Sequence, residues 1–262
     1  MSAVAAASTV FGQRAQRAAD LAERYSYAAE PLALYRAVLG AQERAYLRAR
    51  DEHVDDLVAY VVRTSLPSVM DVTMSTGTET LREAVLLRFH EGDLDRIVRA
   101  WLAGEDLDET DRYLARAAAA PVLEAHPELA ASLRRDGADE RHCPTCGGLP
   151  QLAVFADTGE ALVTGQRRLV CSRCATEWTY ARLVCVSCRE TNGAKMPILA
   201  DEARLPHIRA DACDTCHAYL ITVDVRRDPR AVPLVDEIAA LPLDLLASER
   251  GYTKIARNLM GF

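Results

Sequence analysis

Several features that define other classes of protein are missing from this sequence. No apolar run approaches the roughly 18 residues that a membrane-spanning helix needs, so we expect no contact with a membrane. The opening stretch MSAVAAASTVFGQ (1–13) lacks the basic and apolar regions of a secretory signal. We therefore expect a cytoplasmic protein, in which thiols stay reduced and stable disulfides do not form.

Positive charge is scarce in the first half of the chain. Residues 1–140 carry 16 Arg against 24 Asp and Glu, whereas residues 141–262 carry 15 basic and 14 acidic residues. Neither half has the basic stripe that binding to a phosphate backbone requires. We expect no nucleic-acid partner, and this disfavours a zinc-ribbon adaptor for nucleic acid.

Cysteine is absent from residues 1–140, where apolar residues recur at helical spacing. The pattern begins in FGQRAQRAADLAERY (11–25) and LALYRAVLGAQERAYLRAR (32–50) and continues through 80–89, 95–104 and 108–133. Pro67, Gly104 and Pro121 are expected to punctuate these helices. This half is predicted to be an all-α domain.

All eight cysteines follow, as four CxxC pairs with a repeated spacing. The spacers between successive pairs are 24, 10 and 24 residues long, so each cysteine of the first two pairs recurs 42 residues later. Such a repeat in ligand spacing indicates two equivalent sites. The pairs are Cys143 and Cys146, Cys171 and Cys174, Cys185 and Cys188, and Cys213 and Cys216.

A tetrahedral metal site needs two thiolates from each of two tight turns, and a β-hairpin between the turns brings them together. The equal spacers favour sequential pairing, with Cys143, Cys146, Cys171 and Cys174 around one metal and Cys185, Cys188, Cys213 and Cys216 around another. A nested arrangement, in which the second pair joins the third, stays open. Gly147 and Gly148 suit the exit of the first turn, whereas Ala175, Arg189 and His217 signal the other exits less well.

Other uses of the thiols fit less well. CDTCH (213–217) matches a haem-attachment pattern, but its thiols complete the repeat and we expect no export. Thioredoxin-like chemistry would need a βαβ context that the sequence lacks. His142 and His217 adjoin cysteines, but we leave both out of the sites. Four thiolates suit iron and zinc alike, so the ligands alone do not select the metal.

The segments between the turns are typical of short strands. QLAVF (151–155) and ALVTG (161–165) flank a turn, and YLITVDV (219–225) follows the last turn. Trp178 and Tyr180 are expected to pack over the metal domain. The tail from 233 to 252 has a helical pattern, in which Pro242 should start or kink a turn.

The cysteine half resembles the formate dehydrogenase accessory protein family (FdhE). The resemblance is carried by CPTCGGLP (143–150), CSRCATEWTYARLVCVSC (171–188), CDTCHAYL (213–220) and VDEIAALPLDLLASERGY (235–252). Upstream, AERYSYAAEPLALYRAVLGAQ (22–42) is similar to the helical region of the family. The sequence departs from the family pattern at His217, where glycine is common, and at Pro242.

The resemblance implies a cytoplasmic, non-catalytic accessory factor with a rubredoxin-like metal domain. It implies that the eight cysteines are metal ligands and that iron is the favoured metal, with zinc as the alternative. It also implies binding to the molybdopterin-containing catalytic subunit of formate dehydrogenase before that subunit is exported. The residues themselves offer no partnered nucleophile and no phosphate-cradling loop, so an enzyme is not expected.

We therefore predict an α+β protein. Its expected parts are a helical domain (1–140), two rubredoxin-like or zinc-ribbon-like units with small β-hairpins (141–228), and a C-terminal helix that packs back on the fold (229–262). The predicted function is assembly or activation of formate dehydrogenase, with a stand-alone rubredoxin-like electron carrier as the alternative.

Overall fold

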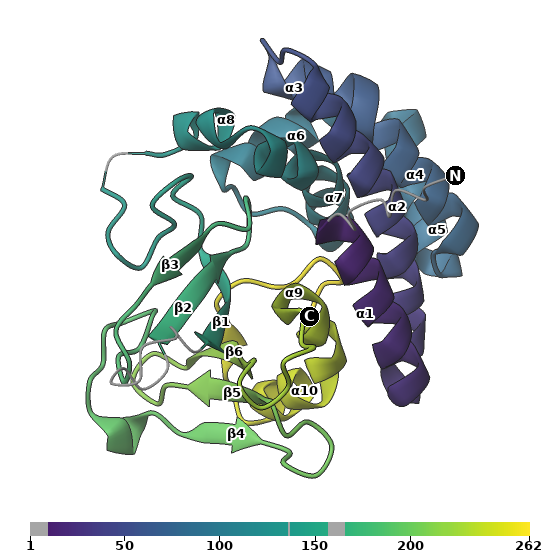
Figure 1. Ribbon diagram of the computed structural model, residues 1–262. Coiled ribbons are helices and arrows are strands. Elements are labelled where there is room, and N and C mark those ends of the chain that lie inside the picture. The colour runs from purple at the N-terminus through teal and green to yellow at the C-terminus, as the bar shows by residue number, and fades with distance from the viewer. Residues whose placement is uncertain (1–9, 136, 157–165) are drawn as a thin grey trace, which may run out of the picture.

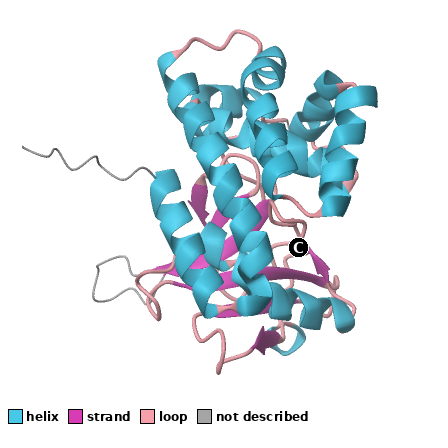
Figure 2. Ribbon diagram, turned by 90° about the vertical axis from the view of Figure 1, so that its right-hand side faces the viewer, coloured by secondary structure: helices cyan, strands magenta, loops and turns pink. Residues whose placement is uncertain are grey.

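A computed structural model of the chain describes residues 10–135, 137–156 and 166–262. The helices of the first half form a bundle that packs against a β-sheet built by the second half, and α9 and α10 lie between the sheet and α1 (Figure 1). Figure 2, turned by 90°, shows the helices of the first half above and in front of the strands. The predicted α+β class is confirmed.

The helical half is organised around its longest helix, α2. This helix contacts α1, α4 and α7, and it buries Leu32, Val38 and Leu39. The predicted helices are present, and the structure adds a helical stretch from residue 57 to residue 76, which the sequence patterns did not single out. The helices are α1 (Val10–Arg24), α2 (Ala29–Asp51), α3 (Leu57–Tyr60), α4 (Leu66–Thr76), α5 (Glu79–Glu91), α6 (Leu94–Ala103), α7 (Glu109–Ala125) and α8 (Pro127–Ser132), with a π turn over Val61–Ser65 joining α3 to α4.

Four of these helices begin at an acidic or hydroxyl side chain that caps the first turn. Asp56, Thr78, Asp93 and Asp108 accept hydrogen bonds from backbone N–H groups of α3, α5, α6 and α7. Such caps satisfy donors that have no partner within the helix. At the other end of α6, Gly104 ends the helix with a positive φ of 75°, as its sequence position predicted.

Pro121 does not punctuate the helices, contrary to the prediction, because α7 runs through it. A proline inside a helix lacks the N–H that would bond to the carbonyl four residues earlier, here that of Ala117. The buried side chain of Gln42 on α2 donates to that carbonyl instead, with Nε2 and O 3.0 Å apart. The neighbouring helix thus supplies the donor that the proline removes.

The predicted hairpins are not separate, because the strands of the two cysteine units join in one sheet. The strand order is β3-β2-β1-β6-β5-β4, with β7 beside β6. Within each unit neighbouring strands are antiparallel, whereas β1 and β6 pair in parallel across the join, with Leu152 opposite Ile221. The predicted strand segment 161–165 lies outside the described residues. The strands are β1 (Pro150–Ala156), β2 (Gln166–Cys171), β3 (Glu177–Thr179), β4 (Ile198–Ala200), β5 (Ile208–Ala212), β6 (Ala218–Asp224) and β7 (Thr253–Lys254).

The strand order preserves the internal repeat seen in the cysteine spacing. In each unit one strand follows the first CxxC turn, a second leads into the next turn and a third leaves it. The order β3-β2-β1 in the first unit therefore corresponds to the order β6-β5-β4 in the second. The units join head to tail, because the last strand of one series, β1, pairs with the first strand of the other, β6. Such a join turns an exposed strand edge of each unit into a paired one.

The C-terminal segment packs between the helices and the sheet. It comprises α9 (Pro233–Asp236), a 3-10 turn (Ile238–Ala240) and α10 (Leu241–Glu249), which contacts β4 and β5. Pro242 lies in the first turn of α10 and starts a new helix, which is one of the two outcomes that the sequence predicted. Beyond it, the buried ammonium of Lys254 lies 2.7 Å from Glu237 and 3.0 Å from Asp244.

One apolar core continues from the helices into the sheet. It includes Leu32 and Leu114 from the helical half and Leu169 and Ile221 from the strands. Among the described residues, no helix combines the length and the apolar character that crossing a bilayer would need.

The contact between Gln42 and Pro121 yields a stability prediction. Gln42→Leu should lower the free energy of unfolding by about 1–3 kcal/mol, because it leaves the buried carbonyl of Ala117 without a donor. The same substitution in a Pro121→Ala background should cost clearly less, since the restored backbone N–H can bond that carbonyl. Denaturant unfolding of the four metal-loaded proteins of this double-mutant cycle measures the difference. Equal costs in both backgrounds would contradict this account.

Candidate metal centres

The eight cysteines form two separate clusters, which we call cluster 1 and cluster 2. In each cluster the four sulfur atoms all lie within 4.8 Å of one another. The pairing is sequential, as the equal spacers favoured, and the nested alternative does not occur. Cluster 1 consists of Cys143, Cys146, Cys171 and Cys174, and cluster 2 of Cys185, Cys188, Cys213 and Cys216.

The distances between sulfur atoms fit a tetrahedral metal ion. In cluster 1 the sulfurs of Cys143 and Cys174 are 3.7 Å apart and those of Cys146 and Cys171 are 3.4 Å apart. In cluster 2 both corresponding distances are 3.7 Å. Four ligands about 2.3 Å from a central ion lie about 3.8 Å from one another, whereas bonded disulfide sulfurs are about 2.05 Å apart. Each cluster can therefore hold one metal ion.

The four CxxC turns share one backbone feature, which the sequence signalled at only one of them. The residue after the second cysteine has a positive φ in every case, although only one of the four is glycine. Side chains other than glycine rarely adopt this conformation, so its recurrence indicates that the turn itself requires it. The φ values are 71° at Gly147, 56° at Ala175, 66° at Arg189 and 53° at His217.

In three of the turns this conformation closes the turn with a backbone hydrogen bond. The N–H groups of Gly147, Arg189 and His217 donate to the carbonyl of the first cysteine of their turns, at 2.8–3.0 Å. Backbone N–H groups also reach the sulfurs, as that of Gly148 does to Cys146 at 3.4 Å. Gly148 has the role that the sequence predicted, because a Cβ at this position would lie 3.0 Å from the sulfur of Cys171.

The thiols of cluster 1 compete for protons because of their proximity. Hydrogen bonds from its three partners lower the pKa of Cys143 far below its usual range, and the bond to Cys143 raises that of Cys146. In cluster 2, burial raises the pKa of Cys185 to about 12. Four thiolates can exist together in such a space only around a cation, so the donor set fits a bound metal ion.

The two clusters differ in their access to solvent. All four cysteines of cluster 1 are buried, whereas Cys188 of cluster 2 is exposed and Cys216 is half-buried. Trp178 and Tyr180 are buried in the metal region, and the indole N–H of Trp178 donates to the carbonyl of Glu140 at 3.0 Å. Cluster 1 is therefore part of the core, while cluster 2 reaches the surface.

The two histidines beside the cysteines belong to neither cluster. The imidazole of His142 lies 3.0 Å from a carboxylate oxygen of Asp139. The ring of His217 lies near that of Tyr252, with centroids 6.1 Å apart. Their exclusion from the predicted sites agrees with this geometry.

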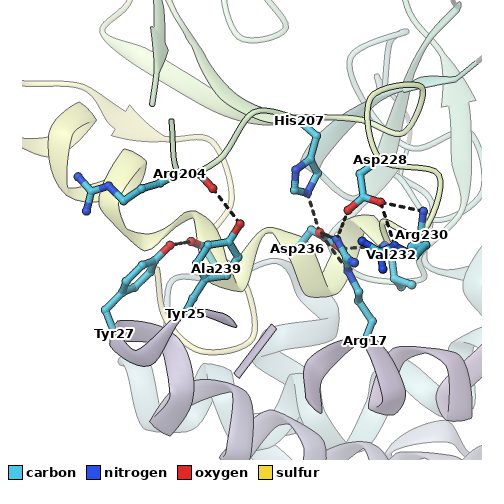
Figure 3. A network of polar contacts seen from close by, with 10 residues as sticks. All are labelled: Arg17, Tyr25, Tyr27, Arg204, His207, Asp228, Arg230, Val232, Asp236 and Ala239. Carbon is cyan, nitrogen blue, oxygen red and sulfur yellow. Dashed lines mark hydrogen bonds and ion pairs between the residues drawn. The ribbon is translucent and has the colours of Figure 1, made fainter. Parts of the chain in front are cut away.

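A third group of potential ligands, which the sequence did not reveal, consists of His207, Asp228 and Asp236 (Figure 3). His207 Nε2 lies 2.8 Å from Asp236 Oδ1, and Arg17 of α1 binds both carboxylates. Burial alone would lower the pKa of Arg17, but its bonds to Asp236 and Asp228 raise the pKa above its usual value. The guanidinium already supplies the positive charge, so this group is an ion-pair network. Arg17 lies more than 200 residues before the two aspartates in the chain, so no local pattern could have found this network.

The shared positive φ predicts opposite effects of two small substitutions. Ala175→Gly should raise the free energy of unfolding of the metal-loaded protein by about 1 kcal/mol, because glycine adopts this φ without strain. Gly147→Ala should lower this free energy by about 1–2 kcal/mol, because alanine is strained at a φ of 71°. The added methyl group would meet only ordinary contacts near Arg134, so strain is the only cost. Denaturant unfolding measures both, and a destabilising Ala175→Gly would refute the account.

The difference in exposure predicts two rates of metal release. With zinc-loaded protein and a chromophoric chelator, we expect one equivalent to leave quickly from cluster 2 and one slowly from cluster 1. Cys188→Ser should remove the fast phase, and Cys143→Ser, as the matched variant, should remove the slow phase. A single phase for both equivalents, or loss of the fast phase in Cys143→Ser, would show that burial does not control release.

Comparison with known proteins supports the resemblance seen in the sequence. Residues 142–182 match the family model of the FdhE central domain, and residues 183–260 match that of the FdhE C-terminal domain. The two models meet between the clusters, so each covers one four-cysteine unit.

Curated relatives carry the same family name. The chain is 28% identical to the FdhE homolog of Aquifex aeolicus over 196 residues, which cover 74% of this chain and 68% of the relative. It is 39% identical to the homolog of Stutzerimonas stutzeri over 126 residues, covering 48% and 40%, and 31% identical to FdhE of Escherichia coli over 122 residues, covering 47% and 38%. The last two alignments thus span well under half of those relatives.

The fold is also that of a solved structure. The crystal structure of FdhE from Pseudomonas aeruginosa superposes with a TM-score of 0.68 at 23% identity, covering 97% of this chain and 96% of that one. The likeness extends over the helical half, which the family models do not reach. The two domain models, which together match residues 142–260, and the named relatives support the FdhE family for this chain.

Proposed function

We propose that this protein is a cytoplasmic accessory factor that assembles or activates formate dehydrogenase by binding its molybdopterin-containing catalytic subunit. The observation that carries the proposal is the arrangement of the cysteines, all eight of which are gathered into two closed clusters. A metal held by four thiolates has no open position for a substrate, in contrast to a catalytic zinc site. A rigid metal-stabilised surface suits recognition of a partner better than turnover.

In this proposal the eight cysteines are the ligands of two metal ions, with iron favoured over zinc. The sulfur spacing and the backbone N–H groups directed at the sulfurs support tetrathiolate sites of the rubredoxin kind. Bound iron would supply a one-electron couple, whereas zinc would be structural only. The cysteines hold the ion, and the backbone donors stabilise the charge on the thiolates.

The predicted domains fit this role as functional units. We propose that residues 1–140 form the acidic helical body, that 141–228 form the metal platform, and that 229–262 attach the platform to the body. Contacts of α9 with α1 and of α10 with the sheet support the attaching role of residues 229–262.

A stand-alone electron carrier is the alternative, and one observation favours it. Cys188 is exposed and Cys216 is half-buried, so a metal in cluster 2 would lie close to the surface, where an electron can pass to another protein. The two proposals differ in what the cell loses without the protein. A carrier would leave the assembly of formate dehydrogenase intact.

The proposal predicts a specific loss of activity. Deleting the gene should abolish most formate dehydrogenase activity, and the purified metal-loaded protein should form a complex with the catalytic subunit in the absence of oxygen. The double variant with Cys143→Ser and Cys146→Ser should fail to restore activity. The control variant Ser132→Ala, which changes a residue outside both clusters, should restore it. Unchanged activity in the deletion strain, together with no complex, would favour the electron carrier.

The identity of the metal can be read separately. Ferric tetrathiolate sites absorb strongly in the visible range, whereas zinc sites are colourless. Anaerobically prepared protein should contain close to two equivalents of iron plus zinc per chain, measured by elemental analysis. A value near one would show that only one cluster binds metal.

A further inference from the structure

A buried arginine of the helical half lies beside cluster 1. Arg116 is on α7 and is only 9% exposed. It lines a cavity of about 40 Å³ together with Gln151 of β1 and Cys171 of the cluster. A cavity of this volume has room for about three water molecules, so the side chains that border it lie close to one another. Arg116 therefore reaches from the helices to the metal region.

The hydrogen bonds of Arg116 hold it in this position. One guanidinium nitrogen donates to the carbonyl of Arg257 at 2.6 Å, and another donates to Oε1 of Gln151. Gln151 follows Pro150, which lies opposite Cys171 in the pairing of β1 with β2. The pair of strands that positions this cysteine thus also positions an acceptor of Arg116.

Arg116 is a buried cation whose direct partners are neutral. Within the part of the chain that the structure describes, no carboxylate forms an ion pair with it. The buried carboxylates nearby bind other cations, since Lys254 lies 2.7 Å from Glu237 and Arg14 lies 3.0 Å from Glu124. A buried charge is costly unless an opposite charge lies close to it.

Cluster 1 supplies an opposite charge when it holds a metal ion. Four thiols that bind a divalent ion release four protons, and the four thiolates then exceed the charge of the ion by two negative charges. All four cysteines of cluster 1 are buried, so water cannot compensate this charge as it can at the exposed Cys188 of cluster 2. Burial lowers the pKa of Arg116, and Glu237, Tyr35 and Cys171 are the negative groups that oppose this shift.

We propose that Arg116 is the charge partner of cluster 1, whose guanidinium compensates the excess negative charge of the four thiolates and raises the affinity of the cluster for a metal ion. Arg116 acts through its charge and is not a ligand. The helical half thereby takes part in metal binding through α7. The proposal rests on the metal-binding part of the proposed function.

The test is the affinity of cluster 1 for zinc, measured by competition with a chromophoric chelator at neutral pH. Cys188→Ser is the background, because it leaves cluster 1 as the intact site. Here Arg116→Gln should weaken zinc binding at least about tenfold, whereas Arg116→Lys, which keeps the charge, should weaken it less than about threefold. In the Cys143→Ser background, which leaves cluster 2 intact, Arg116→Gln should change the affinity less than about twofold.

A second buried arginine controls for a general loss of stability. Arg17 binds Asp228 and Asp236, so Arg17→Gln also removes a buried positive charge from the helical half. In the Cys188→Ser background this variant should bind zinc as the background does. An equal loss of affinity in Arg17→Gln and Arg116→Gln, or an equal loss at both clusters, would show that Arg116 acts only on the stability of the fold and would overturn the proposal.

A measurement with Arg116 in place decides between the outcomes even if Arg116→Gln does not fold. Cluster 1 of the Cys188→Ser protein can be loaded with zinc(II) or with gallium(III), which differ by one charge. The Nε–H resonance of Arg116, identified by its loss in Arg116→Lys, should shift between the two metals, and that of Arg17 should not. An unchanged Arg116 resonance would refute the charge contact.

The outcomes also separate this proposal from the proposed function. Unchanged zinc affinity in a folded Arg116→Gln variant would overturn the role of Arg116 and leave the two metal sites standing. No binding of zinc by the Cys188→Ser protein would overturn the metal site at cluster 1, and the charge partner with it.

Discussion

The second half of the structure depends on bringing four sulfur atoms to within a few ångströms of one another, twice. Each quartet needs two tight turns whose exits have a positive φ, and the chain meets this need with alanine, arginine and histidine as well as glycine. The strained residues keep this φ because the surrounding contacts of the turn outweigh the cost of the strain. The strands leave these turns in set directions, so the geometry of the turns also orients the sheet.

The head-to-tail join of the two units has consequences for the whole molecule. Parallel pairing of β1 with β6 makes one sheet, which α9 and α10 contact, and α9 in turn contacts α1 of the helical half. This packing is secured by polar contacts between distant segments: Arg17 binds Asp236, and Tyr25 donates to the carbonyl of Arg204 at 2.8 Å (Figure 3). Removing one partner of a buried ion pair is costly, so such contacts favour one packing arrangement over others. The helices and the metal units are thereby held as one body.

The same architecture makes two similar sites unequal. Cluster 1 lies in the core, whereas cluster 2 lies toward the surface, with Cys188 exposed. Both clusters consist of four cysteines, so the difference comes from what packs over them. The two halves also differ in charge, since acidic residues outnumber basic ones in residues 1–140, whereas the two kinds nearly balance in residues 141–262. A repeated motif has thus acquired two distinct environments.

The sequence by itself determined the class of the fold, the extent of most helices and the repeated spacing of the cysteines, because helical periodicity and ligand spacing are local or regular in the chain. It favoured the sequential grouping of the cysteines but left the nested one open, and the structure decided between them. It could not show the path of α7 through Pro121, because the compensating donor, Gln42, comes from another helix. Nor could it show the join of β1 to β6, the network around Arg17 or the exposure of Cys188. Those features depend on which surfaces meet in three dimensions, and only the tertiary structure decided them.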